Sequence, residues 1–310
     1  MNNLQRSLRD YVSLRRSLGF KLVEQERCLK QFVLFMNIRD ARCITTSLAL
    51  EWATQPKEAK PGHWARRLSY VRGFANHLQV EHPDTQVPPM QLLPTTISRA
   101  RPYLYSQKEI RGLLVAAKAS SPGDRLPGLS YHCLFGLLAV TGMRIGEALT
   151  LTREDVDLEA GVLTVRTAKF GRVRLLPLHR STQRILRDYA ERRNALLGEP
   201  RSPYFLVAEQ GGRLWGPTVR VAFYELSRKI GLRGPNDHTG PRLHDFRHRF
   251  AIETLLRWYR TGKDVELHLP VLSTYLGHCS VQDTYWYLSA CPELMSAAAR
   301  RLEKRWEKHP

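Results

Sequence analysis

The chain has 310 residues, with 48 Lys and Arg against 29 Asp and Glu, and so a formal net charge of +19. That length accommodates two domains with their own cores, without help from disulfides or metals. Such a charge is self-repelling unless a polyanion is bound, so we expect nucleic acid as the partner. Basic residues outnumber acidic ones 16 to 8 over residues 1–103 and 32 to 21 over 104–310, so both halves share the excess.

The cysteines and the N-terminus indicate the compartment. Five cysteines are an odd number, and they form neither a C-x-x-C pair nor a Cys/His spacing of the zinc type. We expect reduced thiols, as in a cytosol. The first residues lack the apolar core of a signal peptide, and no stretch approaches the roughly 20 apolar residues that span a bilayer. We therefore expect a soluble, cytoplasmic and nucleoid-associated protein with no membrane contact.

The N-terminal part has the spacing of bundled helices. Apolar residues recur at intervals of three or four from the start of the chain, at Leu4, Leu8, Tyr11, Leu14 and Leu18. A proline-rich stretch over 81–103 then excludes a continuous helix and is typical of an extended linker. We expect a helical domain over 1–98, a linker over 99–103 and a second domain over 104–310.

The second part of the chain mixes helices with a small sheet. Ser106 and Glu109 have the spacing of a capping box before an apolar run, which predicts a helix start. Two β-branched runs around a turn glycine predict a β-hairpin over about 161–178, with Lys169 at or near its tip. Helical periodicity returns from Thr182 onward. The predicted fold class is mainly α with a small β-sheet (α+β), in two domains.

Two stretches place arginines where they can bind an anion. In "TGMRIGEALTL" Arg144 opens a helix and Glu147 follows three residues later, which is also the spacing of an ordinary surface ion pair. In "RLHDFRHRFA" His244 and Arg247 share a helix face. His248 lies four residues after His244 and could complete a zinc pair, but no Glu follows His244 and no third ligand is evident. Packing or a phosphate contact is the better interpretation of His248.

The stretch "LGHCSVQDTYWYL" contains His278 and two tyrosines. A helix is expected to end at Gly277 and another to begin near Ser280. On the second helix Tyr285 and Tyr287 lie about 200° apart, so they cannot both face one site. Tyr285 falls on the more apolar stripe and Tyr287 on the polar one, which predicts that Tyr285 packs and that Tyr287 is functional.

These residue types suit attack of a phenolic oxygen on a phosphodiester. Two guanidiniums can bind the non-bridging oxygens and stabilise the charge of the transition state without a metal. A tyrosine needs a positive field or a base to become nucleophilic at neutral pH, and the arginines and His244 can provide these. Lys169 on a hairpin can protonate the leaving 5′-oxygen.

The sequence resembles the tyrosine recombinases, or phage integrase family. "TGMRIGEALTL" is similar to the family's "TGxRxxEhhxL" box (h apolar), "AKFGRVRLLPL" aligns without gaps on "GKGxKxRxVPL", and "HxxR" and "LGH" boxes follow in order. The family's nucleophile lies nine residues after the LGH histidine, which is the position of Tyr287. The resemblance implies the catalytic set Arg144, Lys169, His244, Arg247, His278 and Tyr287, with Glu147 as a supporting acid.

The resemblance also implies a mechanism and partners. A core-binding domain over 1–98 and a catalytic domain over 104–310 would act on double-stranded DNA core sites. A homo-tetramer would exchange strands through 3′-phosphotyrosine intermediates and a Holliday junction, with neither metal nor cofactor, in integration, excision or resolution. Accessory DNA-bending or directionality proteins are possible partners. The segment between the HxxR and LGH boxes is longer than in compact members, as in recombinases of mobile elements.

Three questions stay open at this stage. By resemblance, a C-terminal helix with Leu294, Ala298, Leu302 and Trp306 on one face docks on a neighbouring protomer, and docking on its own domain is the less favoured alternative. Strand relaxation, as in type IB topoisomerases, uses the same chemistry without synapsis. A catalytically inactive DNA-binding regulator of the same fold is the third reading, although every catalytic position carries a competent residue.

Overall fold

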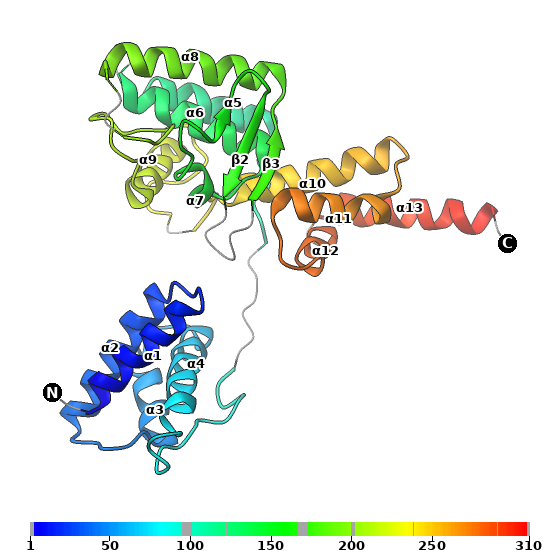
Figure 1. Ribbon diagram of the computed structural model, residues 1–310. Helices are drawn as coiled ribbons and strands as arrows, with labels where there is room; N and C mark the ends of the chain where they lie inside the picture. Colours follow the sequence, from blue (N-terminus) through cyan, green and yellow to red (C-terminus); the bar gives the residue numbers. More distant parts are fainter. Residues whose placement is uncertain are drawn as a thin grey trace. The chain divides into compact units, whose positions relative to one another are not determined.

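The computed structural model describes residues 3–94, 101–121, 123, 125–166, 173–199, 202–237, 239–289 and 291–308. The chain divides into two compact units, Met1–Ala100 and Arg101–Pro310, both drawn in Figure 1. Helices and one small antiparallel sheet make up the regular structure of the described residues, so the predicted α+β class is confirmed. No described helix is both long enough and apolar enough to cross a membrane.

The first unit is a bundle of four described helices, gathered around one core in Figure 1. They are α1 (Asn3–Ser17), α2 (Val23–Ile38), α3 (Thr46–Thr54) and α4 (Pro61–Leu78). Their apolar faces meet around the fully buried ring of Trp52, over which the Arg67 guanidinium lies 3.7 Å from the ring centroid.

The predicted apolar stripe of α1 is buried along only part of its length. Leu4, Leu8 and Tyr11 lie in the core, whereas Leu14 and Leu18 are 48% and 61% exposed. Helical spacing places these residues on one face, but burial requires a neighbouring element to cover it. The last turn of α1 therefore presents an apolar surface.

The proline-rich stretch has no helix or strand over residues 82–94, as its prolines predict. It is nevertheless held against the first unit. The Gln86 N–H donates to the Ile44 carbonyl at 2.7 Å, and Arg72 donates to the carbonyls of residues 88 and 89 at 2.7 and 2.6 Å. The expectation of an extended linker is wrong for this part, because these hydrogen bonds fasten it to the bundle.

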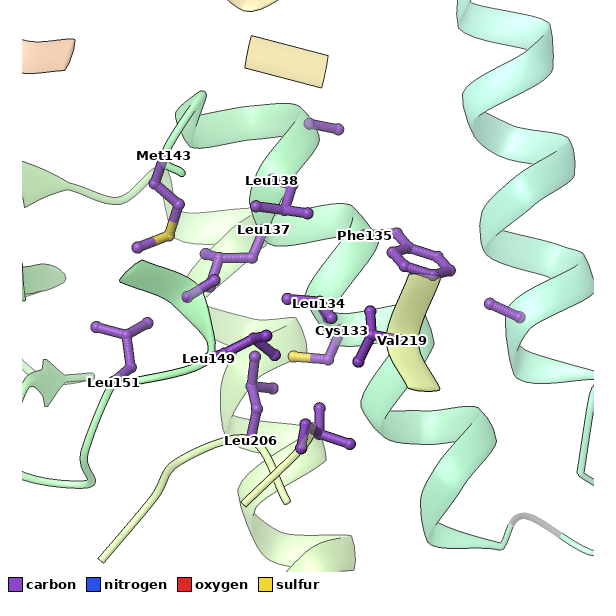
Figure 2. Close-up of a cluster of buried hydrophobic side chains, with 14 of the residues drawn as sticks. Cys133, Leu134, Phe135, Leu137, Leu138, Met143, Leu149, Leu151, Leu206 and Val219 are labelled. Atoms are coloured by element: carbon purple, nitrogen blue, oxygen red, sulfur yellow. The ribbon is translucent and has the colours of Figure 1, made fainter. Parts of the chain in front are cut away.

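The second unit begins with the predicted capping box. The Ser106 hydroxyl accepts from the Glu109 N–H at 3.2 Å, and the Glu109 carboxylate accepts from the Ser106 N–H at 2.6 Å, which starts α5 (Gln107–Lys118). Next comes α6 (Leu126–Thr141), a mostly apolar helix of which most residues are buried. Figure 2 shows its Leu134, Leu137 and Leu138 in the main core.

A short helix, α7 (Ile145–Ala148), precedes the antiparallel sheet of the described residues. The sheet consists of β1 (Val156–Asp157), β2 (Val162–Arg166) and β3 (Val173–Pro177). The predicted hairpin is confirmed, because β2 and β3 pair along their whole length and Val165 lies opposite Arg174. The two-residue strand β1 was not predicted, and Lys169 lies outside the described residues.

The remaining elements are helical. They are α8 (Arg180–Leu197), α9 (Gly216–Lys229), α10 (Asp245–Arg260), α11 (Val265–Leu276), α12 (Gln282–Ser289) and α13 (Pro292–Lys308). Helices α10 to α13 share a core of their own, and α11 also contacts β3. The predicted helix end at Gly277 is confirmed, with Gly277 in the left-handed conformation at φ +70°.

The C-terminal helix α13 begins on its own domain. Leu294 is fully buried in the core shared with α10, and the Arg301 guanidinium donates to the Lys263 carbonyl at 2.6 Å. Further along, Leu302 is 49% exposed. The first half of α13 thus packs within one chain, and docking of the second half on a neighbouring protomer stays a prediction.

Candidate active site

The turn that ends α11 is the centre around which the predicted site residues gather. Arg174, Arg247 and Arg144 donate to the carbonyl oxygens of residues 275, 276 and 277, in that order, at 2.9, 2.7 and 3.0 Å. The last carbonyls of a helix have no partner within the helix and carry its negative partial charge. The C-terminus of α11 therefore fixes three guanidiniums within one small region.

Arg144 is held by its own helix as well. Its N–H and its Nη1 donate to the two oxygens of Glu147 at 2.8 and 3.0 Å. The predicted Arg144–Glu147 pair therefore forms, as a capping arrangement at the start of α7. Burial alone would raise the pKa of Glu147, but hydrogen bonds from Arg174 and Arg144 lower it below its usual value, so the carboxylate is ionised. The Arg144 side chain is still 40% exposed, which leaves it open to an anion.

Arg247 lies deeper, with only 2% of its surface exposed. In the first turn of α10, its Nη1 donates to the Gly142 carbonyl at 3.0 Å and its Nη2 to the Leu276 carbonyl at 2.7 Å. Burial lowers the pKa of Arg247 to about 10, so the group remains charged at neutral pH. Its positive charge also acts on the phenol of Tyr287.

Tyr287 is buried at 3% exposure, with its ring centroid 6.0 Å from that of His278 and 5.6 Å from that of His248. Burial raises the pKa of Tyr287, while the charges of Arg247 and Arg144 act in the opposite direction. The phenol is therefore protonated in the free protein, and its activation requires a base.

The expectation for Tyr285 was wrong. Tyr285 is 53% exposed, whereas Thr284 and Tyr287, both on the predicted polar stripe, are buried. Tyr287 belongs to the core that α10 to α13 share and also lies beside the rings of His248 and His278, so the buried face of α12 meets apolar and polar neighbours alike. An apolar stripe marks the buried face only where the helix packs on an apolar core.

The two predicted site histidines are neutral at pH 7. Burial, with the charges of Arg247 and Arg144 in addition, lowers the pKa of His278 to about 4. Burial and Arg247 also lower the pKa of His244. The Nδ1 of His278 is hydrogen-bonded to the Thr284 hydroxyl at 2.7 Å, which orients the ring and leaves Nε2 for a substrate.

His248 packs between other rings. Its ring centroid lies 4.7 Å from that of His244 and 4.9 Å from that of Trp286, and its buried Nδ1 has no hydrogen-bond partner. No group of three or more metal-ligating side chains forms in the part of the chain that the structure describes. The contacts of His248 are those of a packing residue beside Tyr287.

The structure thus brings together Arg144, Glu147, Arg247, His278 and Tyr287, with His244 at the start of α10. Two cations, two neutral imidazoles and a phenol at one turn can bind a phosphodiester and attack it. The predicted general acid Lys169 lies outside the described residues.

Residues 105–293 match the model of the phage integrase family. The chain belongs to this family. It is 50% identical over 311 residues to the putative integrase/recombinase y4rB of Sinorhizobium fredii (strain NBRC 101917 / NGR234), with 99% of each chain covered. It is 29% identical over 260 residues to tyrosine recombinase XerD of Xanthomonas campestris pv. campestris, covering 81% of this chain and 75% of that protein.

The fold is also similar to that of a lambda integrase solved as a tetramer bound to a Holliday junction. The TM-score is 0.64 at 19% identity, over 92% of this chain and 76% of that one. The predicted family and the predicted enzyme class, tyrosine site-specific recombinase, are confirmed.

Two residues of this integrase-family site were missed by reasoning from the sequence. Arg174 sits on β3 among apolar residues, and the available signal was its match to the arginine of the family's "KxRxVPL" string. Thr284 was assigned to the polar stripe but not to His278, because a hydrogen bond across the turn between α11 and α12 cannot be read from spacing.

Proposed function

We propose that Tyr287 is the nucleophile with which this recombinase cuts DNA. The observation that carries the proposal is the position of Tyr287, which is buried beside the ring of His278 and under the charge of Arg247, next to the turn that also holds Arg144. The two guanidiniums bind the non-bridging oxygens of the scissile phosphate and stabilise the pentacoordinate transition state.

The covalent step conserves the phosphodiester energy. Tyr287 loses its phenolic proton to the neutral imidazole of His244, and its oxygen forms a bond to phosphorus as the bond to the 5′-oxygen breaks. Lys169 supplies the proton that the leaving 5′-oxygen takes up. The result is a 3′-phosphotyrosine and a free 5′-hydroxyl, which attacks the phosphotyrosine of the partner strand in the reverse reaction.

Assembly with DNA follows from the same proposal. Residues 1–98 act as a core-binding domain and 104–310 as the catalytic domain, and four protomers synapse two core sites and pass through a Holliday junction. The similarity to a lambda integrase tetramer bound to such a junction supports this. We place the enzyme in the cytoplasm, associated with the nucleoid, because its substrate is there, and among recombinases of mobile elements.

A two-site plasmid separates this function from its alternatives. Two direct copies of the DNA that flanks the gene are placed on one supercoiled plasmid and incubated with wild type and with Tyr287→Phe. We expect wild type to release two smaller circles and the variant to release none. Relaxed circles of the original size would indicate a type IB topoisomerase, and footprinted binding without any change in topology would indicate an inactive regulator.

A further inference from the structure

Arg174 is the best-connected arginine of the site, and the recombinase mechanism above does not use it. Its side chain, on β3, is only 10% exposed. Its Nη1 and Nη2 donate to the two oxygens of Glu147 at 3.1 and 2.6 Å, and its Nε donates to the Tyr275 carbonyl at 2.9 Å. Such a two-pronged pair fixes both partners in position and orientation.

The carboxylate of Glu147 is shared between two arginines. It accepts the pair from Arg174 and, at the same time, the N–H and the Nη1 of Arg144. A buried carboxylate paired with Arg144 alone would offset the charge that Arg144 presents to an anion, because charges interact strongly where water is excluded. Arg174 adds the positive charge that balances Glu147.

A second arginine of the same sheet provides the contrast. Arg166, on β2, donates to the buried carboxylate of Asp155 at 2.8 Å. The other hydrogen bonds that the Asp155 carboxylate accepts come from the N–H and the hydroxyl of Thr152, and not from a site arginine. Arg174 therefore differs from Arg166 in what its carboxylate partner touches. It also forms the tighter pair, two-pronged and 10% exposed, whereas Arg166 donates one hydrogen bond and is 65% exposed.

We propose that Arg174 is a positioning residue that neutralises Glu147 and so leaves the full charge of Arg144 for the scissile phosphate. It acts through Glu147 and does not itself contact DNA. The proposal rests on the proposed function, since it presumes that Arg144 binds the phosphate. In this arrangement Glu147 aligns Arg144, and Arg174 removes the electrostatic cost of that alignment.

The test is single-turnover formation of protein-linked DNA on a nicked duplex at saturating protein, so that differences in DNA affinity do not matter. We expect Arg174→Gln to lower the rate at least about tenfold, and Arg174→Lys, which keeps the charge, to lower it less. Arg166→Gln is the control for losing an arginine–carboxylate pair elsewhere on the sheet, and it should stay within about twofold of wild type. Melting temperatures and DNA binding are measured for every variant.

Two further measurements distinguish neutralisation of Glu147 by Arg174 from a purely structural role in which Arg174 only holds Glu147 in place. Adding Glu147→Gln to Arg174→Gln removes the unbalanced charge, so the double variant should cleave faster than Arg174→Gln alone. With an uncharged methylphosphonate at the scissile position, the cleavage rate of Arg174→Gln should come closer to that of wild type. An uncharged group needs less positive charge from Arg144. Two results together would overturn the proposal. The double variant would cleave more slowly than Arg174→Gln, and Arg174→Gln would be slower than wild type by the same factor on methylphosphonate as on phosphate.

Failure of this proposal is distinguishable from failure of the proposed function. If wild type links DNA and Arg174→Gln links it equally fast, Arg174 has no positioning role and the function stands. If wild type forms no link, or Tyr287→Phe forms one, the proposed function fails and this proposal fails with it. Should Arg174→Gln not fold, the comparison of Arg174→Lys with the double variant decides the question by the same criteria.

Discussion

Thr284 should control the orientation of His278. Thr284→Val removes the hydroxyl that is bonded to Nδ1 of His278 and keeps the shape of the side chain. We expect cleavage of nicked DNA to fall about tenfold, because a freely rotating imidazole spends less time in the productive geometry. Thr284→Ser keeps the hydroxyl and should remain close to wild type.

The matched control for Thr284 is Thr254→Val. Thr254 lies on α10, and its hydroxyl donates to a carbonyl of the same helix, one turn earlier. The same substitution there should leave the rate of cleavage unchanged. Equal rates for Thr284→Val and Thr254→Val would show that the His278 contact has no part in the reaction.

His248 should make the stability of the protein depend on pH. Burial, together with His244, lowers the pKa of His248 to about 4 from an ordinary value of 6.5. Between these two values the unfolded chain binds the proton more strongly, so the free energy of unfolding falls as the pH falls from 6.5 toward 4.

His248→Leu removes that dependence. Between pH 7 and pH 5 the wild type should lose more stability than the variant, by on the order of 1 kcal/mol, as measured by urea unfolding at both pH values. Each protein is compared with itself at the two pH values, so the change in packing caused by the substitution cancels from the difference in the free energy of unfolding. An equal loss in both proteins would contradict the assignment of a depressed pKa to His248.

The two tyrosines of α12 show which features of single residues could be predicted from the sequence. The motif spacing selected Tyr287, and the structure places Tyr287 beside Arg247 and His278. The helix-face argument failed for Tyr285, because it expected the more apolar stripe of the helix to pack, and Tyr285 on that stripe is exposed. The buried face of α12 carries Thr284 and Tyr287 and meets both apolar and polar neighbours, which only the three-dimensional structure reveals.

At the scale of elements, the end of α11 is the feature on which the site depends. Gly277 has φ +70°, and a Cβ built there would lie 2.8 Å from Nη1 of Arg174. Gly277→Ala therefore forces both a strained backbone and a displaced guanidinium. We expect a loss of at least about 1 kcal/mol of stability and a loss of cleavage of about tenfold or more, measured by thermal unfolding and by DNA linkage.

Gly262 provides the control for the backbone effect alone. It follows the end of α10 with the same φ of +70°, but a Cβ there would meet nothing within 4 Å. Gly262→Ala should cost a similar strain energy and leave cleavage intact. If both variants cleave DNA as wild type does, the turn after α11 does not organise the arginines.

Most elements could be predicted because their signals are local. The Ser106 cap, the paired strands of the hairpin and the Gly277 helix end each depend on a few adjacent residues. The convergence of three arginines on the carbonyls of 275–277 could not be predicted, because it depends on how β3, α7, α10 and α11 pack. Long-range packing leaves no periodic trace in a sequence.

At the scale of the whole molecule, the charge of +19 predicts how this recombinase responds to salt. Binding that neutralises many phosphates releases counterions, so affinity falls steeply as salt rises. Between 50 and 200 mM salt we expect the Kd for a core-site duplex to rise at least about a hundredfold, measured by fluorescence anisotropy. A Kd that barely changes would show that the basic residues are not at the DNA interface.

The central claim is that Tyr287 forms the covalent bond to DNA. The most direct test incubates wild type, Tyr287→Phe and Tyr285→Phe with nicked duplexes from the DNA that flanks the gene, and detects protein-linked DNA after denaturation in SDS. Because Tyr285 is exposed and Tyr287 is buried beside His278 under the charge of Arg247, we expect the link in wild type and in Tyr285→Phe and its absence in Tyr287→Phe. A link that survives Tyr287→Phe would contradict the assignment.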